Sequence, residues 1–320
     1  MNDNRPNTKL IGAFAVALSA MLWGVDGILL TPQLYNLNTA FVVFVIHLFP
    51  FLLMNVFFFK EYHRLKTMTR SDLLYFFLIA LFGGALGTLA IVKSLFLLHF
   101  NNLSVVVLLQ KLQPVFAVIL ARIILKERIK KHFVFWASIA LIAGYFLTFG
   151  WALPDFSTEG ITTFYAALLS LLAAFSFGSS TVFSKKILGS YSFVSSTFFR
   201  YGFTTLIMLV IVLFAGHIGD FSQITPRNWL FIALIGLTTG SGAIFLYYYG
   251  LRHVKASLST FLELMYPITA VVLDYFVNKT VYTPMQWSAA FVMLFAIVML
   301  NVSGNNVSFP RNSKRNQRLS

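Results

Sequence analysis

Long uninterrupted runs of apolar residues constrain this chain more than any other feature of its sequence. A helix needs about twenty consecutive apolar residues to cross a hydrocarbon core of about 30 Å. Runs of this length recur throughout the 320 residues, and they predict ten spans, at 10–30, 39–59, 73–96, 103–125, 132–151, 162–184, 193–215, 228–250, 257–277 and 284–302. We therefore expect an all-α integral membrane protein with ten transmembrane helices.

The composition also favours a membrane protein over a soluble domain. Hydrophobic residues make up 58% of the sequence and charged residues only 11%, whereas a soluble domain carries about 25% charged residues. Cysteine is absent, which excludes disulfides, thiolate metal sites and a cysteine nucleophile. The sequence has no Walker-type phosphate-binding motif, so ATP-driven pumping is not expected. We expect no cofactor, no metal site and no catalytic residue.

The net charge of +14 indicates how the chain is oriented in the membrane. Lys and Arg gather in one set of alternating loops and at both ends of the chain, whereas the other set of loops holds only Arg227 and Lys279. Basic loops stay in the cytoplasm, so we expect segment 1–9 and the basic tail 303–320 to be cytoplasmic, in a multi-pass protein of the cell inner (plasma) membrane. The basic residues are scattered over many loops, so no nucleic-acid partner is expected.

The second half of the sequence repeats the first. The positions that carry the match are glycine, serine and proline: Gly83 and Gly87 align with Gly236 and Gly240, and Ser104 and Pro114 align with Ser257 and Pro267. Each half holds five spans, and an odd number makes the halves enter the membrane in opposite senses. We therefore expect two inverted five-helix repeats, at 10–151 and 152–302.

This arrangement resembles the EamA-type branch of the drug/metabolite transporter superfamily. The carriers of the resemblance are the small residues before Trp23 in the first span, the basic residues His47 and Arg200, and the motif 126–128 after the fourth span. Two departures stand out, because His47 replaces the usual arginine and Thr280 replaces an acidic residue in the second half. The resemblance implies a ten-helix permease that works by alternating access, with export as the direction by analogy.

Polar and aromatic residues within the spans are the candidate binding groups. A charge at membrane depth costs about 2.5–3.5 kcal/mol and therefore faces protein or a water-filled cavity. The candidate substrate-binding residues are Trp23, Asp26, His47, Lys93, Gln110, Lys111, Gln113, Arg200, Tyr247 and Glu263. For each of them a purely structural role is the alternative.

Lys111 lies among glutamines shortly before Pro114, in the fourth span. A proline inside a helix removes one backbone hydrogen bond and loosens the turn. Three polar residues at such a bend predict the lining of a cavity. The alternatives for Lys111 are a permanent ion pair with Glu263 or Asp26, or extension of its side chain towards the lipid headgroups.

Glu263 occupies the equivalent bend of the ninth span, four residues before Pro267. Its carboxyl group could carry a proton across the membrane, or it could pair with Lys111 and only hold the halves together. His47 could exchange a proton near neutral pH, or it could be a hydrogen-bonded core residue.

The remaining candidates are also open to two interpretations. Arg200 offers a planar fork for a carboxylate or phosphate, although its place near the cytoplasmic side favours extension to the interface. Lys93 lies near the outer end of its span, where lining a pocket and reaching the headgroups are equally expected. Tyr247 either joins an interfacial aromatic belt or stacks on a solute ring, and Asp26 contacts either Trp23 or an ammonium group of the solute.

Taken together, the residues predict a secondary transporter that moves a small organic metabolite through a cavity at the membrane midplane. Cationic and anionic candidates together fit an amino acid or a related carboxylate, with protons as a second candidate partner beside the lipid bilayer. The oligomeric state stays open. The alternatives are a lipid-modifying membrane enzyme, for which the loop acids Asp155, Glu159 and Asp220 are too scattered, and a channel without alternating access.

Overall fold

The computed structural model describes residues 6–99, 103–113, 115–116, 119–120, 131–151, 158–253, 262–263, 265–279 and 281–304. Within these ranges the chain is helical and has no β-strand. Pro114, the motif 126–128, Thr280 and most of the predicted tail lie outside the described residues. The expected loosening of the helix at Pro114 itself is therefore not described, although the turn before it is.

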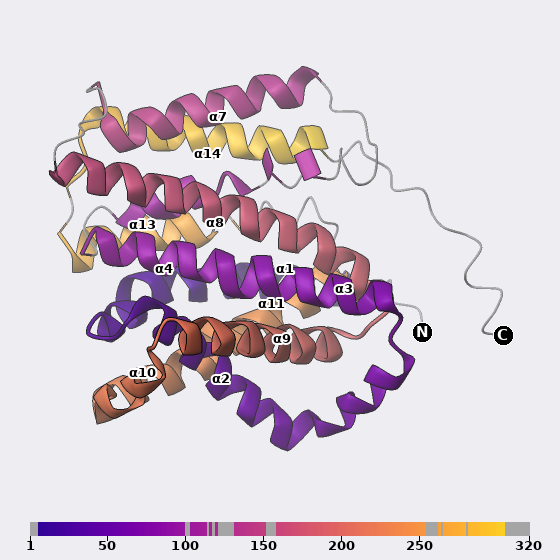
Figure 1. Cartoon of the computed structure of the whole chain (residues 1–320). Helices are drawn as coiled ribbons and strands as arrows, with labels where there is room; N and C mark the ends of the chain where they lie inside the picture. Colours follow the sequence, from indigo (N-terminus) through magenta and orange to yellow (C-terminus); the bar gives the residue numbers. More distant parts are fainter. Residues whose placement is uncertain are drawn as a thin grey trace.

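The helices follow one another with short connections (Figure 1). In chain order the first half contains α1 (Pro6–Val25), η1 (Asp26–Leu30), η2 (Thr31–Leu34), α2 (Thr39–Phe58), η3 (Phe59–Thr67), α3 (Arg70–Ile79), η4 (Ala80–Leu86), α4 (Gly87–Leu97), α5 (Leu103–Gln110) and α7 (Lys131–Phe149). The second half contains α8 (Thr158–Leu188), α9 (Phe193–Phe214), η5 (Ile218–Gln223), α10 (Pro226–Leu234), η6 (Ile235–Gly240), α11 (Ser241–His253), α13 (Met265–Val277) and α14 (Pro284–Gly304).

Several of these helices are long and apolar enough to cross a membrane, so the chain is a multi-pass membrane protein. In the described part there are 6 such helices, at Thr8–Leu34, Thr39–Thr67, Arg70–Leu97, Gly160–Leu188, Phe193–Phe214 and Pro226–His253. Shorter apolar helices cover Val134–Phe146, Ile268–Val277 and Pro284–Ala296. The predicted spans 103–125 and 257–277 include residues that are not described, so the full set of ten stays a prediction.

Several contacts between helices are symmetric: when each helix is replaced by its equivalent in the other half, the resulting pair is also in contact. If α1 corresponds to α8, α4 to α11 and α5 to α13, the contact of α1 with α11 becomes that of α8 with α4, and both contacts are present. The contact of α1 with α13 becomes that of α8 with α5, which is also present. The equivalent helices α2 and α9 pack on each other, as do α7 and α14, which lie side by side at the top of Figure 1.

Helix starts repeat between the halves as well. Thr69 caps α3 through a reciprocal pair of hydrogen bonds with Asp72, and Thr225 caps α10 through the same pair with Asn228. Such capping boxes satisfy backbone N–H groups at the helix start that would otherwise lack partners. Each of these helices then runs into a π-helical segment, η4 or η6. The duplication therefore extends to local backbone geometry.

Small residues in these π-helical segments let neighbouring helices approach closely. A Cβ atom on Gly83 in η4 would lie 2.1 Å from the hydroxyl oxygen of Ser180 in α8. A Cβ atom on Gly236 in η6 would lie 2.9 Å from the ring of Phe49 in α2. Close packing of this kind is the usual role of glycine between membrane helices. It brings η4 and η6 next to the interior, where the candidate site lies.

Candidate functional site

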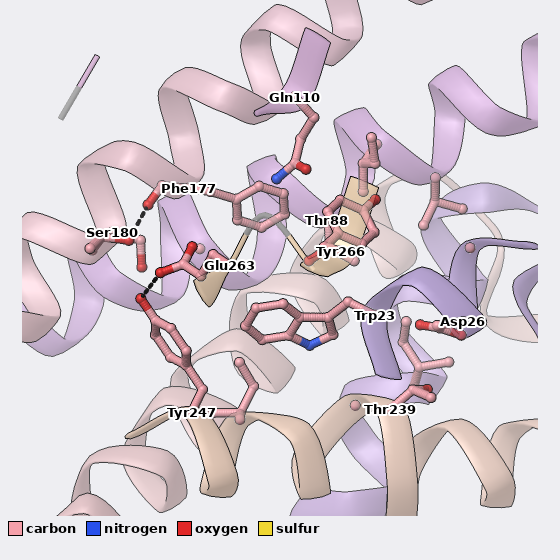
Figure 2. A pocket seen from close by; sticks show the side chains of 18 of the residues that line it. Trp23, Asp26, Thr88, Gln110, Phe177, Ser180, Thr239, Tyr247, Glu263 and Tyr266 are labelled. Carbon is pink, nitrogen blue, oxygen red and sulfur yellow. Dashed lines mark hydrogen bonds between the residues drawn. The ribbon is translucent and has the colours of Figure 1, made fainter. Parts of the chain in front are cut away.

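A cavity of about 210 Å³ lies between the two halves. Its walls come from both halves. The first half contributes α1, η1, η2, α2, η4, α4 and α5, and the second contributes α8, α9, η6, α11 and the start of α13. Figure 2 draws 18 of the lining side chains and labels ten of them, with Trp23 near the centre of the view. A pocket between packed repeats is the usual place for a solute in a secondary transporter.

All but one of the residues predicted from sequence line this cavity. Those that line it are Trp23, Asp26, His47, Gln110, Lys111, Gln113, Arg200, Tyr247 and Glu263. Lys93 is the exception, because its side chain is exposed on α4 and is not part of the lining. The structure thus gathers residues from six different helical segments around one space.

Lys111 and Glu263 lie together and are both buried, with exposed fractions of 5% and 6%. The two charges interact electrostatically, and the ammonium nitrogen of Lys111 also lies 4.5 Å from the ring centroid of Tyr266. Tyr247 donates a hydrogen bond of 2.8 Å to Oε1 of Glu263. We call these four residues the Glu263 cluster. Lys111 and Glu263 thus interact electrostatically, but within the described part of the chain they form no salt bridge with each other at a nitrogen–oxygen distance of 4.0 Å or less.

The backbone beside Lys111 explains why its side chain reaches the cavity. Helix α5 ends at Gln110, and the N–H groups of Lys111 and Leu112 bond three residues back, to Leu108 and Leu109, at 3.0 and 3.1 Å. This tighter turn replaces the α-helical pattern. A tighter turn therefore lies at Lys111, whereas the predicted loosening at Pro114 stays a prediction.

Asp26 occupies a different environment on the far side of Trp23 from Glu263 (Figure 2). It begins η1, is half-buried, and accepts a hydrogen bond of 3.1 Å from the hydroxyl of Thr31. Thr239 in η6 lines the same part of the cavity. Among the described residues, no Lys, Arg or His nitrogen lies within 4.0 Å of its carboxylate. We call Asp26, Thr31 and Thr239 the Asp26 site.

Arg200 points into the protein rather than to the lipid headgroups. Its guanidinium group donates to the carbonyl oxygen of Gly83 at 2.7 Å and to the hydroxyl of Tyr248 at 3.1 Å. Tyr248 in turn shares a hydrogen bond of 2.9 Å with Ser184. The extension to the interface favoured by the sequence is therefore absent, and Arg200 ties η4 of one half to α11 of the other.

His47 is buried in α2 and faces the same space. Its Nδ1 lies 2.8 Å from the carbonyl oxygen of Val43, and its ring centroid lies 5.2 Å from that of Tyr201. A carbonyl oxygen only accepts, so Nδ1 carries the proton and, in a neutral ring, Nε2 is an acceptor. His47 therefore combines a hydrogen-bonded core position with a place in the cavity wall.

Aromatic rings make up much of the wall. The ring centroids of Trp23 and Tyr247 are 5.4 Å apart, and those of Tyr247 and Tyr248 are 6.0 Å apart. Phe177 and Tyr266 add two further rings, and neither was among the sequence candidates. Phe177 could have been found, because it aligns with Trp23 when the halves are superimposed in sequence. Tyr247 lies here and not in an interfacial belt.

Gln110 leaves one acceptor in the cavity wall without a partner. Its Nε2 donates to Oε1 of Gln113 at 3.3 Å, but its own Oε1 is buried and has no hydrogen-bond partner. A buried polar atom without a partner costs about 1–3 kcal/mol. A solute with an N–H or O–H group could satisfy it. No group of three or more His, Asp or Glu side chains suited to a metal ion is present in the part of the chain that the structure describes.

Comparison with known proteins places the site in context. The EamA-like transporter family matches the chain twice, over residues 10–150 and 164–302. A protein of Fusobacterium nucleatum subsp. nucleatum, named riboflavin transporter ImpX, is 51% identical over 292 residues, which cover 91% of this chain and 97% of that protein. A solved crystal structure matches 96% of this chain and 100% of its own with a TM-score of 0.56 and 16% identity, so the two share a fold.

Proposed function

The chain belongs to the EamA-like transporter family, and we propose that it is a secondary transporter that moves riboflavin, or a close flavin relative, by alternating access. Its role as a small-molecule transporter follows from the family and from the transporter-named relative. Three finer statements belong to the proposal. The chain forms ten transmembrane helices in two inverted repeats, it lies in the inner (plasma) membrane, and both termini are cytoplasmic.

The observation that carries the choice of solute is the relationship to riboflavin transporter ImpX, at 51% identity across nearly the whole of both proteins. Identity of this extent over the full length makes a shared solute the simplest hypothesis. The amino acid expected from sequence rested only on the count of intramembrane charges. Neither the family nor the relative supports it.

The chemistry of the cavity is consistent with a flavin. Riboflavin combines a flat three-ring system, an imide edge with one N–H between two carbonyl groups, and a chain of hydroxyl groups, and it is uncharged at neutral pH. Rings of Trp23, Tyr247, Tyr266 and Phe177 offer faces for stacking. The free acceptor of Gln110 matches the imide N–H. Lys111 and Glu263 carry opposite charges and interact with each other, so together they do not require a charged solute.

The size of the cavity implies that its walls move when a flavin enters. Its volume of about 210 Å³ is below the range of about 300–1,000 Å³ that is common for pockets of drug-sized ligands. Riboflavin binding would therefore require rearrangement of side chains or of the halves. Such a rearrangement is part of alternating access, in which the repeats rock around the site.

Transport into vesicles of purified protein tests the proposal. Proteoliposomes preloaded with unlabelled riboflavin should accumulate labelled riboflavin transiently, and uptake should saturate with concentration. Unlabelled riboflavin outside should compete, whereas a free amino acid should not. Amino acid counterflow without riboflavin counterflow would overturn the choice of solute. Current without saturation would favour the channel, and modification of a lipid without solute movement would favour the enzyme.

The absence of cysteine makes the proposed topology directly testable. Single cysteines introduced near either end of the chain should react with a membrane-impermeant maleimide only when the cytoplasmic face is accessible. A cysteine at Arg227, in a loop expected outside, should show the opposite pattern. Termini on opposite faces would contradict two five-helix repeats.

A further inference from the structure

We propose that Asp26 is the site at which this transporter takes up and releases a proton during its cycle. The inference rests on the proposed function, because it assigns a driving ion to the same cavity. Its chemistry is a reversible protonation, in which a proton from water binds one carboxylate oxygen and later returns to water on the opposite side. The carboxyl group is neutral when protonated and negative when it is not.

The first argument is the lack of a counter-charge. Asp26 faces the cavity from a membrane-spanning helix, and the groups that interact with its carboxylate there are hydroxyls, those of Thr31 at 3.1 Å and of Thr239. An ionised carboxylate away from bulk water needs a cation or several donors to be stable. No basic side chain of the described residues comes within 4.0 Å. When the cavity closes, a proton is the simplest group that can neutralise it.

The neighbours of Asp26 supply no alternative cation. The π-helical segment η1 packs on α1, η2, α13 and η6. The titratable groups that interact with Asp26 are two phenols, Tyr201 from α9 and Tyr266 from α13. Thr31 in η2 and Thr239 in η6 add hydroxyl groups. All of these groups are uncharged at neutral pH.

The cations elsewhere in the cavity are already engaged. Lys111 interacts with Glu263 and lies over the ring of Tyr266. Arg200 donates to the carbonyl oxygen of Gly83 and to the hydroxyl of Tyr248. In the described cavity wall, the negative charge of Asp26 is therefore the one that solvent must stabilise or a proton must neutralise.

The second argument is the position of Asp26 between the halves. η1 belongs to the first half and contacts η6 of the second, and both segments are π-helical. π-Helical turns are rare and occur frequently at functional sites. If the halves rock against each other, the hydroxyl of Thr239 moves relative to Asp26. The surroundings of the carboxylate then differ between the two states, as coupling of a proton to the conformational change requires.

Measurement of pH-driven transport tests this inference. An imposed difference of one pH unit, at one proton per flavin, can sustain an accumulation of about tenfold. We expect the wild type to reach a value of this order with one sign of the gradient, and that sign distinguishes symport from antiport. Asp26→Asn, which keeps the size of the side chain and can still accept from Thr31, should abolish the accumulation while riboflavin counterflow remains measurable.

The matched control is Glu61→Gln, which removes a carboxylate from the exposed segment η3, where it pairs with Arg64. This variant should accumulate riboflavin like the wild type. Loss of counterflow together with pH-driven uptake in folded Asp26→Asn would assign Asp26 to solute binding and overturn the coupling role. Counterflow by a wild type that ignores the pH gradient would also overturn it, while leaving riboflavin transport intact.

A measurement without solute separates the two proposals. Infrared difference spectra recorded across a pH titration should show the carbonyl band of a protonated carboxylic acid that disappears in Asp26→Asn and persists in Glu61→Gln. This band is expected even if riboflavin is the wrong solute. Its absence at every pH in the wild type would overturn the proton site whatever the solute is.

Discussion

The two acidic residues of the cavity lie on opposite sides of Trp23 (Figure 2) and differ in almost every contact. Glu263 is buried, accepts a hydrogen bond from Tyr247 and interacts with Lys111. Asp26 is half-buried and accepts from Thr31, and the titratable groups that interact with it are the phenols of Tyr201 and Tyr266. The same chemical group is thus fixed in one place and left open to protonation in the other.

This difference suggests that the two carboxylates have different roles in one pocket, a structural role for Glu263 and a proton-binding role for Asp26. The interacting charges of Lys111 and Glu263 can shape the wall and link the end of α5 to the start of α13. An isolated carboxylate changes charge whenever its surroundings change. From the sequence, Glu263 was the candidate proton carrier, whereas Asp26 was expected to contact Trp23 or an ammonium group of the solute. Only the surroundings of the two carboxylates in three dimensions favour Asp26 for the proton.

The largest expected effect follows from breaking the pair in the Glu263 cluster. Glu263→Gln leaves the Lys111 ammonium group buried without its counter-charge, and loss of one partner of a buried pair costs about 3–5 kcal/mol of folding stability. The thermal unfolding midpoint in detergent should fall markedly. The double variant Lys111→Met/Glu263→Gln should recover much of the loss, because no unpaired charge remains.

Asp26→Asn is the matched comparison for that experiment. It removes a carboxylate that has no basic partner among the described residues, so its unfolding midpoint should stay at or above that of the wild type. A loss as large as that of Glu263→Gln would mean that the two carboxylates are equally engaged. The contrast between the two sides of Trp23 would then be wrong.

The second effect concerns the ring that separates the two sides. Trp23→Ala removes the stacking surface between Tyr247 and the Asp26 site. Stacking of a base-like ring on an aromatic side chain is worth about 1–3 kcal/mol, so the Kd for riboflavin should rise by about 5- to 150-fold. Quenching of flavin fluorescence on binding measures it. Trp23→Phe should retain most of the affinity, and equal affinity in all three proteins would exclude stacking on Trp23.

Most of the sequence candidates line this cavity because of a physical constraint on membrane helices. Charged and amide side chains such as Lys111, Glu263 and Gln110 are too costly to face lipid, so their presence in apolar spans already placed them inside. The constraint does not apply to Lys93, because a lysine near the end of a span can extend its ammonium group to water. The duplicated helices were visible for a related reason, because close packing required glycine at Gly83 and Gly236 in both halves.

The remainder depended on three-dimensional packing. Tyr266 and Thr239 are ordinary residues of a membrane helix, and nothing in their sequence context distinguishes a cavity wall from a lipid-facing surface. The π-helical geometry of η1, η4 and η6 has no sequence signal of its own, because the glycines of η4 and η6 indicate only close packing. The direction of Arg200 was misjudged because its acceptors, above all the carbonyl oxygen of Gly83, come from another helix.

A smaller effect is expected on the Glu263 side of the pocket, from the amide of Gln110. Gln110→Leu removes the acceptor proposed for the imide N–H, and one hydrogen bond contributes about 0.5–1.5 kcal/mol. The KM for riboflavin should rise by about 2- to 12-fold. For a flavin methylated at the imide nitrogen, the KM values of the wild type and of Gln110→Leu should differ far less. Glu61→Gln, on the exposed segment η3, is the control, and equal discrimination by all three proteins would contradict the assignment.

The smallest effect is expected for Lys93, which contrasts with Lys111 although both are lysines of apolar spans. Lys111 is buried in the cavity wall, whereas Lys93 is exposed on α4 and outside the lining. Surface substitutions usually change stability by no more than about 0.5 kcal/mol, so Lys93→Gln should leave the unfolding midpoint and the KM for riboflavin within error of the wild type. Lys111→Gln, measured in parallel, should change both. A rise in KM for Lys93→Gln comparable to that for Lys111→Gln would show that the solute path extends beyond the cavity along α4, because only contact with the solute on its way could make an exposed lysine matter.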